Sequence, residues 1–117
     1  MSLYAKAWSL YEADRYQEAE KIFRELTVKE GIRPSYWKGL GHTLKMQKKF
    51  AEALDAYCAA LYLGAKTETS FLVHVAECYK EVGDKSKLKS LLQLIEQKAE
   101  PTNKTWIIEL KKAWCNS

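Results

Sequence analysis

Apolar residues recur every three to four positions through most of the chain, which is the period of an amphipathic α-helix. Short polar stretches interrupt this pattern. The pattern predicts six helices, over about 2–13, 17–29, 35–47, 51–63, 70–82 and 85–98. Pro34 lies where the third helix begins, a position that favours proline. Gly83 and Asp84 mark the turn before the sixth helix. All connections are short, so consecutive helices are predicted to pack as antiparallel pairs.

A further helix is predicted near the C-terminus, over about 102–115. Pro101 ends the preceding helix, and Thr102 or Thr105 can cap the new one. Its apolar residues at helical spacing are Trp106, Ile107, Leu110 and Trp114. Stacked repeats need a terminal element with a polar outer face, so this segment is predicted to be a capping helix.

The apolar pattern also repeats along the chain. A shift of 34 residues places small residues on small ones and aromatic residues on aromatic ones: Ala7 on Gly41, Tyr16 on Phe50, Ala19 on Ala53, and Phe23 on Tyr57. A shift of 35 residues continues this match more weakly into a third unit. The middle unit reads Trp37-x2-Leu40-Gly41-x2-Leu44, followed by Ala53-x3-Tyr57. This is the tetratricopeptide signature with Leu44 in place of its Tyr.

The period therefore predicts an all-α protein, a right-handed α-solenoid of three tetratricopeptide repeats plus a C-terminal capping helix. The single domain spans 1–117, with repeats at about 1–33, 34–68 and 69–99, and the capping helix at about 102–115. The small residues Ala7, Gly41 and Ala76 are predicted to let the two helices of each repeat approach closely. Phe23 and Tyr57 are predicted to fill the space toward the next repeat. Leu88 replaces a small residue, so the third repeat should be degenerate or pack differently.

Composition agrees with this interpretation. The 117 residues include only five Gly and two Pro, too few breakers for most all-β folds. No apolar run reaches the roughly 18 residues that a transmembrane helix needs. Cys58, Cys78 and Cys115 are far apart and odd in number, which indicates free thiols in a reducing compartment. The net charge of +4 is interspersed along the chain, which favours solvated helix faces over a nucleic-acid partner.

The chain lacks a constellation of residues typical of catalysis. His42 and His74 fall in different repeats, and neither has a Cys or carboxylate at ligand spacing. Gly39 and Gly41 lie inside a predicted helix rather than in a phosphate-binding loop. Cys78 has no base beside it, and a packing role is the simpler interpretation. We therefore predict a protein that is not an enzyme and that carries no metal and no cofactor.

A stack of helix pairs presents a concave face lined by the first helix of each pair. The residues that should face this groove lie at −3, +1 and +4 from the small residue of each repeat. They are Tyr4, Trp8 and Tyr11 in the first repeat, Lys38, His42 and Lys45 in the second, and Val73, Glu77 and Lys80 in the third. The sequence thus predicts a peptide-binding groove.

The first of these sets contains three aromatic residues. They are predicted to be surplus to packing, because Leu3, Ala7 and Leu10 already provide apolar contacts. One interpretation is an aromatic floor for the apolar side chains of an extended peptide, since aromatic anchors dominate binding pockets. The other is a contact with a preceding helix or a second subunit. The second set can hold peptide carbonyls or an acidic side chain, or simply be solvated. The first set also replaces the Lys and Asn of the tetratricopeptide carboxylate clamp, which disfavours binding of heat-shock protein tails.

Three segments carry a family resemblance: Tyr36-Trp37-Lys38-Gly39-Leu40-Gly41, Phe71-Leu-Val-His74-Val-Ala-Glu77-Cys78, and Val82-Gly83-Asp84. Over about residues 3–98 the chain resembles the class II chaperones of bacterial type III secretion, which serve hydrophobic translocator proteins. The resemblance implies a chaperone of the bacterial cytoplasm that holds an extended apolar translocator segment in its groove and keeps the client soluble and export-competent. It implies no nucleic-acid partner and no stable membrane association. The groove residues that it carries over are Tyr4, Trp8, Tyr11, His42, Lys45, His74 and Glu77.

The chain departs from the family pattern in three places. It begins almost at the first repeat, without the N-terminal extension that the family uses in dimer contacts, so a homodimer is left open. Lys48 replaces a Gly at the turn of the second repeat, and Leu88 replaces a small residue. A generic tetratricopeptide scaffold that joins partners through its convex face is the alternative function. A nucleic-acid or regulatory module is a third hypothesis, which the interspersed charge opposes.

Overall fold

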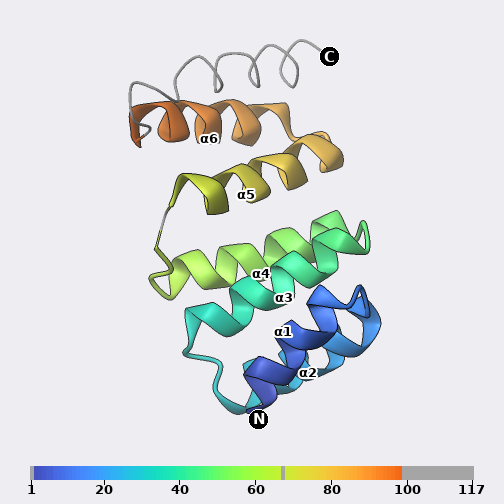
Figure 1. The fold of residues 1–117 in the computed structure, drawn as a ribbon. Coiled ribbons are helices and arrows are strands. Elements are labelled where there is room, and N and C mark those ends of the chain that lie inside the picture. Colours follow the sequence, from blue (N-terminus) through green and yellow to red (C-terminus); the bar gives the residue numbers. More distant parts are fainter. Residues whose placement is uncertain (1, 67, 99–117) are drawn as a thin grey trace. The chain divides into compact units, whose positions relative to one another are not determined.

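The structure is a computed structural model that describes residues 2–66 and 68–98. In these residues it contains six α-helices and no strand (Figure 1). The helices are α1 (Leu3–Glu12), α2 (Tyr16–Lys29), α3 (Pro34–Met46), α4 (Phe50–Tyr62), α5 (Thr69–Val82) and α6 (Lys85–Lys98). Every predicted helix boundary lies within one residue of the observed one, and the all-α class is confirmed. The predicted capping helix over 102–115 lies outside the described residues.

The chain divides into two compact units, Met1–Lys66 and Thr67–Ser117. In the first unit α1 packs on α2, α2 on α3, and α3 on α4, so two antiparallel helix pairs stack in chain order (Figure 1). In the second unit α5 packs on α6. The helix pairing that the 34-residue period predicts is therefore present inside each unit. The predicted single domain and its repeat boundaries stay predictions.

The three turns between paired helices share one backbone geometry. Asp14, Lys48 and Gly83 occupy the same place in successive repeats, and all three have a left-handed φ, of 61°, 63° and 80°. The next amide in each case donates to the carbonyl oxygen five residues before it: Arg15 to Leu10, Lys49 to Leu44, and Asp84 to Tyr79. This is the Schellman helix end, which favours glycine at the left-handed position. The second repeat thus places Lys48 in a conformation that costs a side chain about 1–2 kcal/mol.

Helix α3 passes close to two aromatic rings, and two glycines make this approach possible. A Cβ on Gly41 would lie 2.6 Å from the Tyr57 ring, and a Cβ on Gly39 would lie 2.4 Å from Cε1 of Phe23. The predicted role of Gly41 as the small contact between paired helices is confirmed. Phe23 fills the space between the first and second repeats, as predicted. The matching requirement at Gly39 was not anticipated.

The second unit has its own apolar core, formed by Leu72 and Ala76 of α5 with Leu88 and Leu92 of α6. Leu88 is 1% exposed, so the larger side chain that replaces the usual small residue is fully buried in this core. Asp84 begins α6 by accepting a hydrogen bond from the Lys87 amide through Oδ1. The third repeat therefore keeps the paired-helix arrangement and packs it around a leucine.

Candidate functional site

Four half-buried aromatic rings form a continuous surface on α1 and the start of α3. Tyr4 and Trp8 lie 6.2 Å apart between ring centroids, and Trp8 and Tyr11 lie 5.1 Å apart. Tyr36 of α3 joins them at 5.3 Å from Tyr4. The contacts along α1 are edge-to-face, the arrangement that aromatic pairs favour. We call Tyr4, Trp8, Tyr11 and Tyr36 the aromatic floor.

The aromatic floor rests on the ring of Phe23, which is fully buried. Its centroid lies 6.2 Å from that of Tyr4 and 5.2 Å from that of Trp8. The expectation that these aromatics are surplus to packing was therefore wrong for Tyr4 and Trp8. Leu3, which was expected to supply that packing, is 40% exposed. One part of the Tyr4 ring and of the Trp8 ring thus packs against the core, and the rest of each ring is exposed to solvent.

Tyr11 differs from these two residues, because its ring contacts are with Trp8 and with Tyr16 at 5.4 Å. Burial raises the pKa of Tyr11 above its ordinary value, so its hydroxyl stays protonated at neutral pH. Tyr16 donates a hydrogen bond to Oδ1 of Asp14, 2.8 Å away, and this bond raises the pKa of Tyr16. Of the α1 aromatics, Tyr11 can therefore be changed with the least damage to the core.

His42 lies at the edge of the aromatic floor, with its ring 6.4 Å from that of Trp8. A hydrogen bond of 2.7 Å joins its Nδ1 to the hydroxyl of Tyr57, which is fully buried. Lys38 and Lys45 are half-buried one turn before and one turn after His42 on α3. The structure therefore brings the predicted residues of the first two repeats onto neighbouring helices of one unit.

Four predicted residues of the third repeat lie on α5, in the second unit: Val73, His74, Glu77 and Lys80. Val73 packs against the apolar core of that unit, so part of its side chain is used in folding. His74 and Glu77 are half-buried on the same helix, and Lys80 is exposed. The role of all four in binding stays a prediction.

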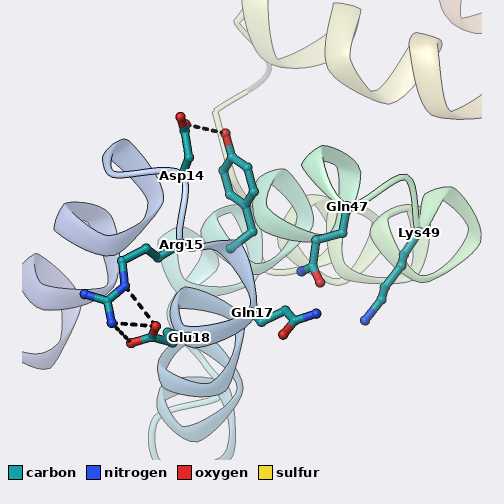
Figure 2. A pocket seen from close by; sticks show the side chains of 7 residues that line it. Asp14, Arg15, Gln17, Glu18, Gln47 and Lys49 are labelled. Atoms are coloured by element: carbon teal, nitrogen blue, oxygen red, sulfur yellow. Dashed lines mark hydrogen bonds and ion pairs between the residues drawn. The ribbon is translucent and has the colours of Figure 1, made fainter.

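The hollow beside the turns of the first two repeats has a different character (Figure 2). Its volume is about 520 Å³, and its lining is polar: Asp14, Arg15, Tyr16, Gln17, Glu18, Gln47 and Lys49. Arg15 and Glu18, two of these lining residues, form an ion pair of 2.6 Å. Because six of the seven lining residues carry a charged or amide side chain, this hollow does not suit an apolar peptide segment.

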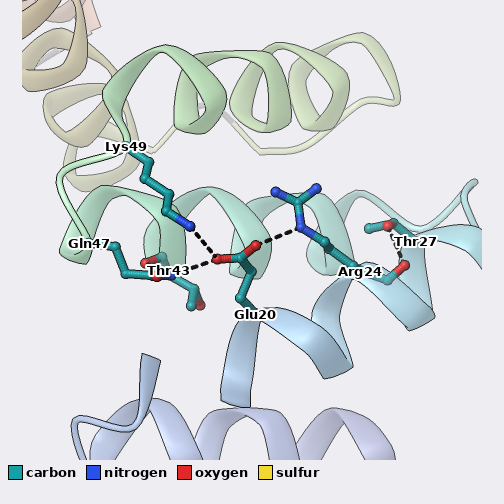
Figure 3. A network of polar contacts seen from close by, with 6 residues as sticks. All are labelled: Glu20, Arg24, Thr27, Thr43, Gln47 and Lys49. Carbon is teal, nitrogen blue, oxygen red and sulfur yellow. Dashed lines mark hydrogen bonds and ion pairs between the residues drawn. The ribbon is translucent and has the colours of Figure 1, made fainter. Parts of the chain in front are cut away.

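A half-buried carboxylate next to this hollow connects α2 to the α3–α4 turn (Figure 3). Glu20 accepts hydrogen bonds from Arg24 at 2.7 Å, Gln47 at 2.8 Å and Lys49 at 3.3 Å, and its side chain is 15% exposed. Burial alone would raise the pKa of Glu20, but these three hydrogen bonds outweigh it and lower the pKa. The network holds the first two repeats together by charge as well as by packing.

Two features of the site were not found from the sequence. Tyr36 was read only as part of a motif, although it extends the aromatic floor across to α3. Phe23 was read as a packing residue, and its support of Tyr4 and Trp8 depends on contacts between helices.

In residues 2–66 and 68–98, no three His, Cys, Asp or Glu side chains come together as metal ligands. In that same part of the chain, every helix is too short or too polar to cross a bilayer.

Comparison with known proteins bears on this geometry. The tetratricopeptide repeat family matches residues 34–66. Chaperone protein SicA of Salmonella typhimurium is 29% identical over 98 residues, which are 84% of this chain and 59% of SicA. The Yersinia enterocolitica type III secretion chaperone SycD, solved with a peptide of the translocator YopD, matches with a TM-score of 0.81 at 26% identity. That match covers 95% of this chain and 88% of SycD. The chain is homologous to the type III secretion translocator chaperones.

A second solved relative of this group is PcrH of Pseudomonas aeruginosa, in complex with the chaperone binding region of PopD. It matches with a TM-score of 0.77 at 25% identity and covers 97% of this chain and 86% of PcrH. The resemblance stated from the sequence and the tetratricopeptide fold are both confirmed. The chain spans about three fifths of the length of the curated relatives that it matches.

Proposed function

We propose that this protein is a secretion chaperone of the bacterial cytoplasm that binds an extended apolar segment of a hydrophobic type III translocator protein. The observation that carries the proposal is the aromatic floor, a continuous set of half-buried rings on the helices that line the groove of a tetratricopeptide stack. It is supported by the relatives SycD and PcrH, which are solved with segments of YopD and PopD. Binding would keep the client soluble and export-competent.

Each part of the site has a proposed role. The rings of Tyr4, Trp8 and Tyr11 take apolar side chains of the client, because aromatic rings give large contact areas at low entropic cost. Lys38, His42 and Lys45 hold its backbone carbonyls or an acidic side chain. The third-repeat residues Val73, His74 and Glu77 bind the client from the second unit.

We also propose that the protein is not an enzyme and works without a cofactor, a nucleic-acid partner or stable membrane association. The relatives SicA and SycD are chaperones, which supports this. A homodimer is a competing use of the same aromatic floor, and SycD has been solved as a dimer. Client binding and dimer formation would then exclude each other at this surface.

The proposal is tested by calorimetric titration of the protein with two probes, the chaperone binding region of PopD and the YopD peptide. We expect Tyr11→Ala to weaken binding at least tenfold, since interface aromatics commonly contribute more than about 1.4 kcal/mol. Trp8→Phe is the companion variant, because it keeps a ring on Phe23 while shortening the exposed surface. Ile32→Ala is the matched control, an 82% exposed apolar residue between α2 and α3 that is not part of the aromatic floor. Binding of wild-type strength by both aromatic variants contradicts the groove assignment.

One observation favours the alternative function of an interaction scaffold. Val28 and Tyr62 occupy the same place in successive repeats, at the ends of α2 and α4, and they are 84% and 91% exposed. Apolar side chains exposed at a repeated position suit a partner that contacts the second helices of the stack. If Val28→Ser with Tyr62→Ser abolishes binding while Tyr11→Ala is silent, the scaffold replaces the groove as the binding surface.

A further inference from the structure

The ring of Phe23 is buried and closely packed. A Cβ on Gly39 of α3 would sit 2.4 Å from Cε1 and 2.7 Å from Cζ of the ring. The centroids of Tyr4 and Trp8 lie 6.2 Å and 5.2 Å from that of Phe23. Phe23 itself is 0% exposed. The ring therefore neighbours both the backbone of α3 and two rings of the aromatic floor.

A methyl group at Gly39 could not be accommodated by a small adjustment. Carbon atoms in contact lie about 3.5–4.0 Å apart, so the ring would have to move by about 1 Å. Protein interiors are close-packed, so a displaced ring displaces what it touches. Its aromatic contacts are Tyr4 and Trp8, which are half-buried and have solvent on their outer side. The displacement of Phe23 would thus change the positions of the Tyr4 and Trp8 rings.

Gly39 is not explained by the repeat signature. In the tetratricopeptide pattern the small residue is Gly41, and Gly39 falls at a position that the signature leaves open. Glycine is a poor helix former, and Gly39 lies inside α3 with its surface buried. Its presence therefore has a packing reason, and the contact with Phe23 supplies it.

We propose that Gly39 is a positioning residue for the aromatic floor, setting through Phe23 how deep Tyr4 and Trp8 lie and hence how large a client side chain they accept. Gly39 is buried and does not touch the client. This inference deepens the proposed function and rests on it only for the binding measurement. The depth of Trp8 can be measured without any client.

The first measurement is acrylamide quenching of Trp8 fluorescence, in protein whose other tryptophans, Trp37, Trp106 and Trp114, are changed to Phe. We expect Gly39→Ala to raise the quenching constant about 1.5-fold, because a close-packed ring transmits its displacement to Trp8. Gly64→Ala is the matched control. Gly64 has φ +92° and open space around its Cβ, so alanine there strains the backbone without touching the aromatic floor. The control should lose stability and leave quenching unchanged.

The second measurement is a double-mutant cycle between Gly39→Ala and Phe23→Leu, read as the Kd for the PopD region. If Gly39 acts through the Phe23 ring, Gly39→Ala weakens binding about tenfold alone and less than about twofold in the Phe23→Leu background. A role of Gly39 in general stability would instead give the same loss in both backgrounds.

The outcomes separate the two proposals. Unchanged Trp8 quenching in Gly39→Ala overturns the positioning role, as does equal quenching in Gly39→Ala and Gly64→Ala. An equal loss of affinity in both Phe23 backgrounds also overturns it. If the wild-type protein binds neither the PopD region nor the YopD peptide, the proposed function fails for those clients, and the quenching result alone decides the positioning role.

Discussion

The first and second repeats place different residues at equivalent positions and support them in the same way. Trp8 and His42 are 34 residues apart, and so are the buried aromatics Phe23 and Tyr57. Trp8 lies 5.2 Å from Phe23, and His42 lies 5.3 Å from Tyr57. In each repeat a buried ring of the second helix packs against a residue of the first helix. Both repeats therefore have a buried supporting ring. The side chain that it supports is an indole in the first repeat and an imidazole in the second.

This difference divides the groove by chemistry. The first repeat offers aromatic rings that meet a buried ring edge to face, a surface for apolar side chains. The second offers a hydrogen-bonded imidazole flanked by Lys38 and Lys45, a surface for polar backbone or acidic groups. An extended client has both kinds of group, because its side chains and carbonyls alternate along the strand. The two supports can be broken separately, and the expected effects differ in size.

The largest effect is expected from removal of the ring under the first repeat. Phe23→Ala should lower the free energy of unfolding by about 3–5 kcal/mol, because it leaves a cavity below Tyr4 and Trp8. Urea unfolding followed by circular dichroism measures this loss. Phe23→Leu, which keeps most of the volume, should cost markedly less. Equal losses for the two variants would mean that the ring does not support the aromatic floor.

The next largest effect is expected from removing the charge of Glu20, whose hydrogen bonds connect the first two repeats. Glu20→Gln should lower stability by about 1–2 kcal/mol at pH 7, because hydrogen bonds to a charged acceptor are the stronger ones. At the equivalent place in the second repeat the chain has buried Leu54, so this charge belongs to the first repeat. Urea unfolding of both proteins across pH measures the difference.

The pH dependence of this difference has a definite sign. The pKa of Glu20 is lowered in the folded protein, so its stabilising contribution is full above the unfolded pKa, about 4.3 for Glu. The contribution disappears as the pH falls through the folded pKa, and the two proteins should converge there. A difference that is the same at pH 7 and pH 3 would exclude the carboxylate charge as its source.

A smaller effect is expected from the second support. Tyr57→Phe keeps the ring beneath His42 and removes only the hydroxyl, so it should cost about 0.5–1.5 kcal/mol. The chemical shifts of the His42 ring should change while those of Trp8 stay in place, which NMR can record. A Trp8 change as large as the His42 change would show that the two supports are not separate.

The smallest effect is at the turn of the second repeat, and it is stabilising. Lys48→Gly should raise the free energy of unfolding by about 0.5 kcal/mol, because the cost that a Cβ brings at a φ of 63° exceeds the extra entropy that glycine loses on folding. Lys48→Ala is the control and should give no such gain. Asp14 has the same φ in the first repeat, but Asp→Gly there gains less, since Asp tolerates this conformation and bonds to Tyr16.

The helix ends and turns could be predicted from the sequence because they depend on residues close in the chain. The apolar period defines each helix face, and Pro34 and Gly83 fit the helix start and the helix end where they stand. The period also identified Gly41 as the close contact, because a small residue recurs there in every repeat. The candidate residues of the first two repeats are on neighbouring helices, as the spacing predicts. Their part in binding remains to be measured.

Contacts between repeats could not be predicted in the same way. Tyr4 and Tyr36 are 32 residues apart, and their ring contact depends on how α1 crosses α3. The surplus of aromatics in α1 was overestimated for the same reason. The spacing of residues along one helix shows which rings lie on the same face of that helix. It does not show whether a ring from another helix packs against them.

The sequence by itself determined the helices, their pairing and the repeat, because backbone hydrogen bonding and side-chain period are local properties of the chain. Only the tertiary structure decided that Phe23 neighbours both Gly39 and the aromatic floor. That arrangement depends on close packing among α1, α2 and α3, where a shift of about 1 Å in one ring changes which atoms touch. The depth of Tyr4 and Trp8 and their support by Phe23 thus depend on the packing of the three helices. The period of the sequence does not determine them.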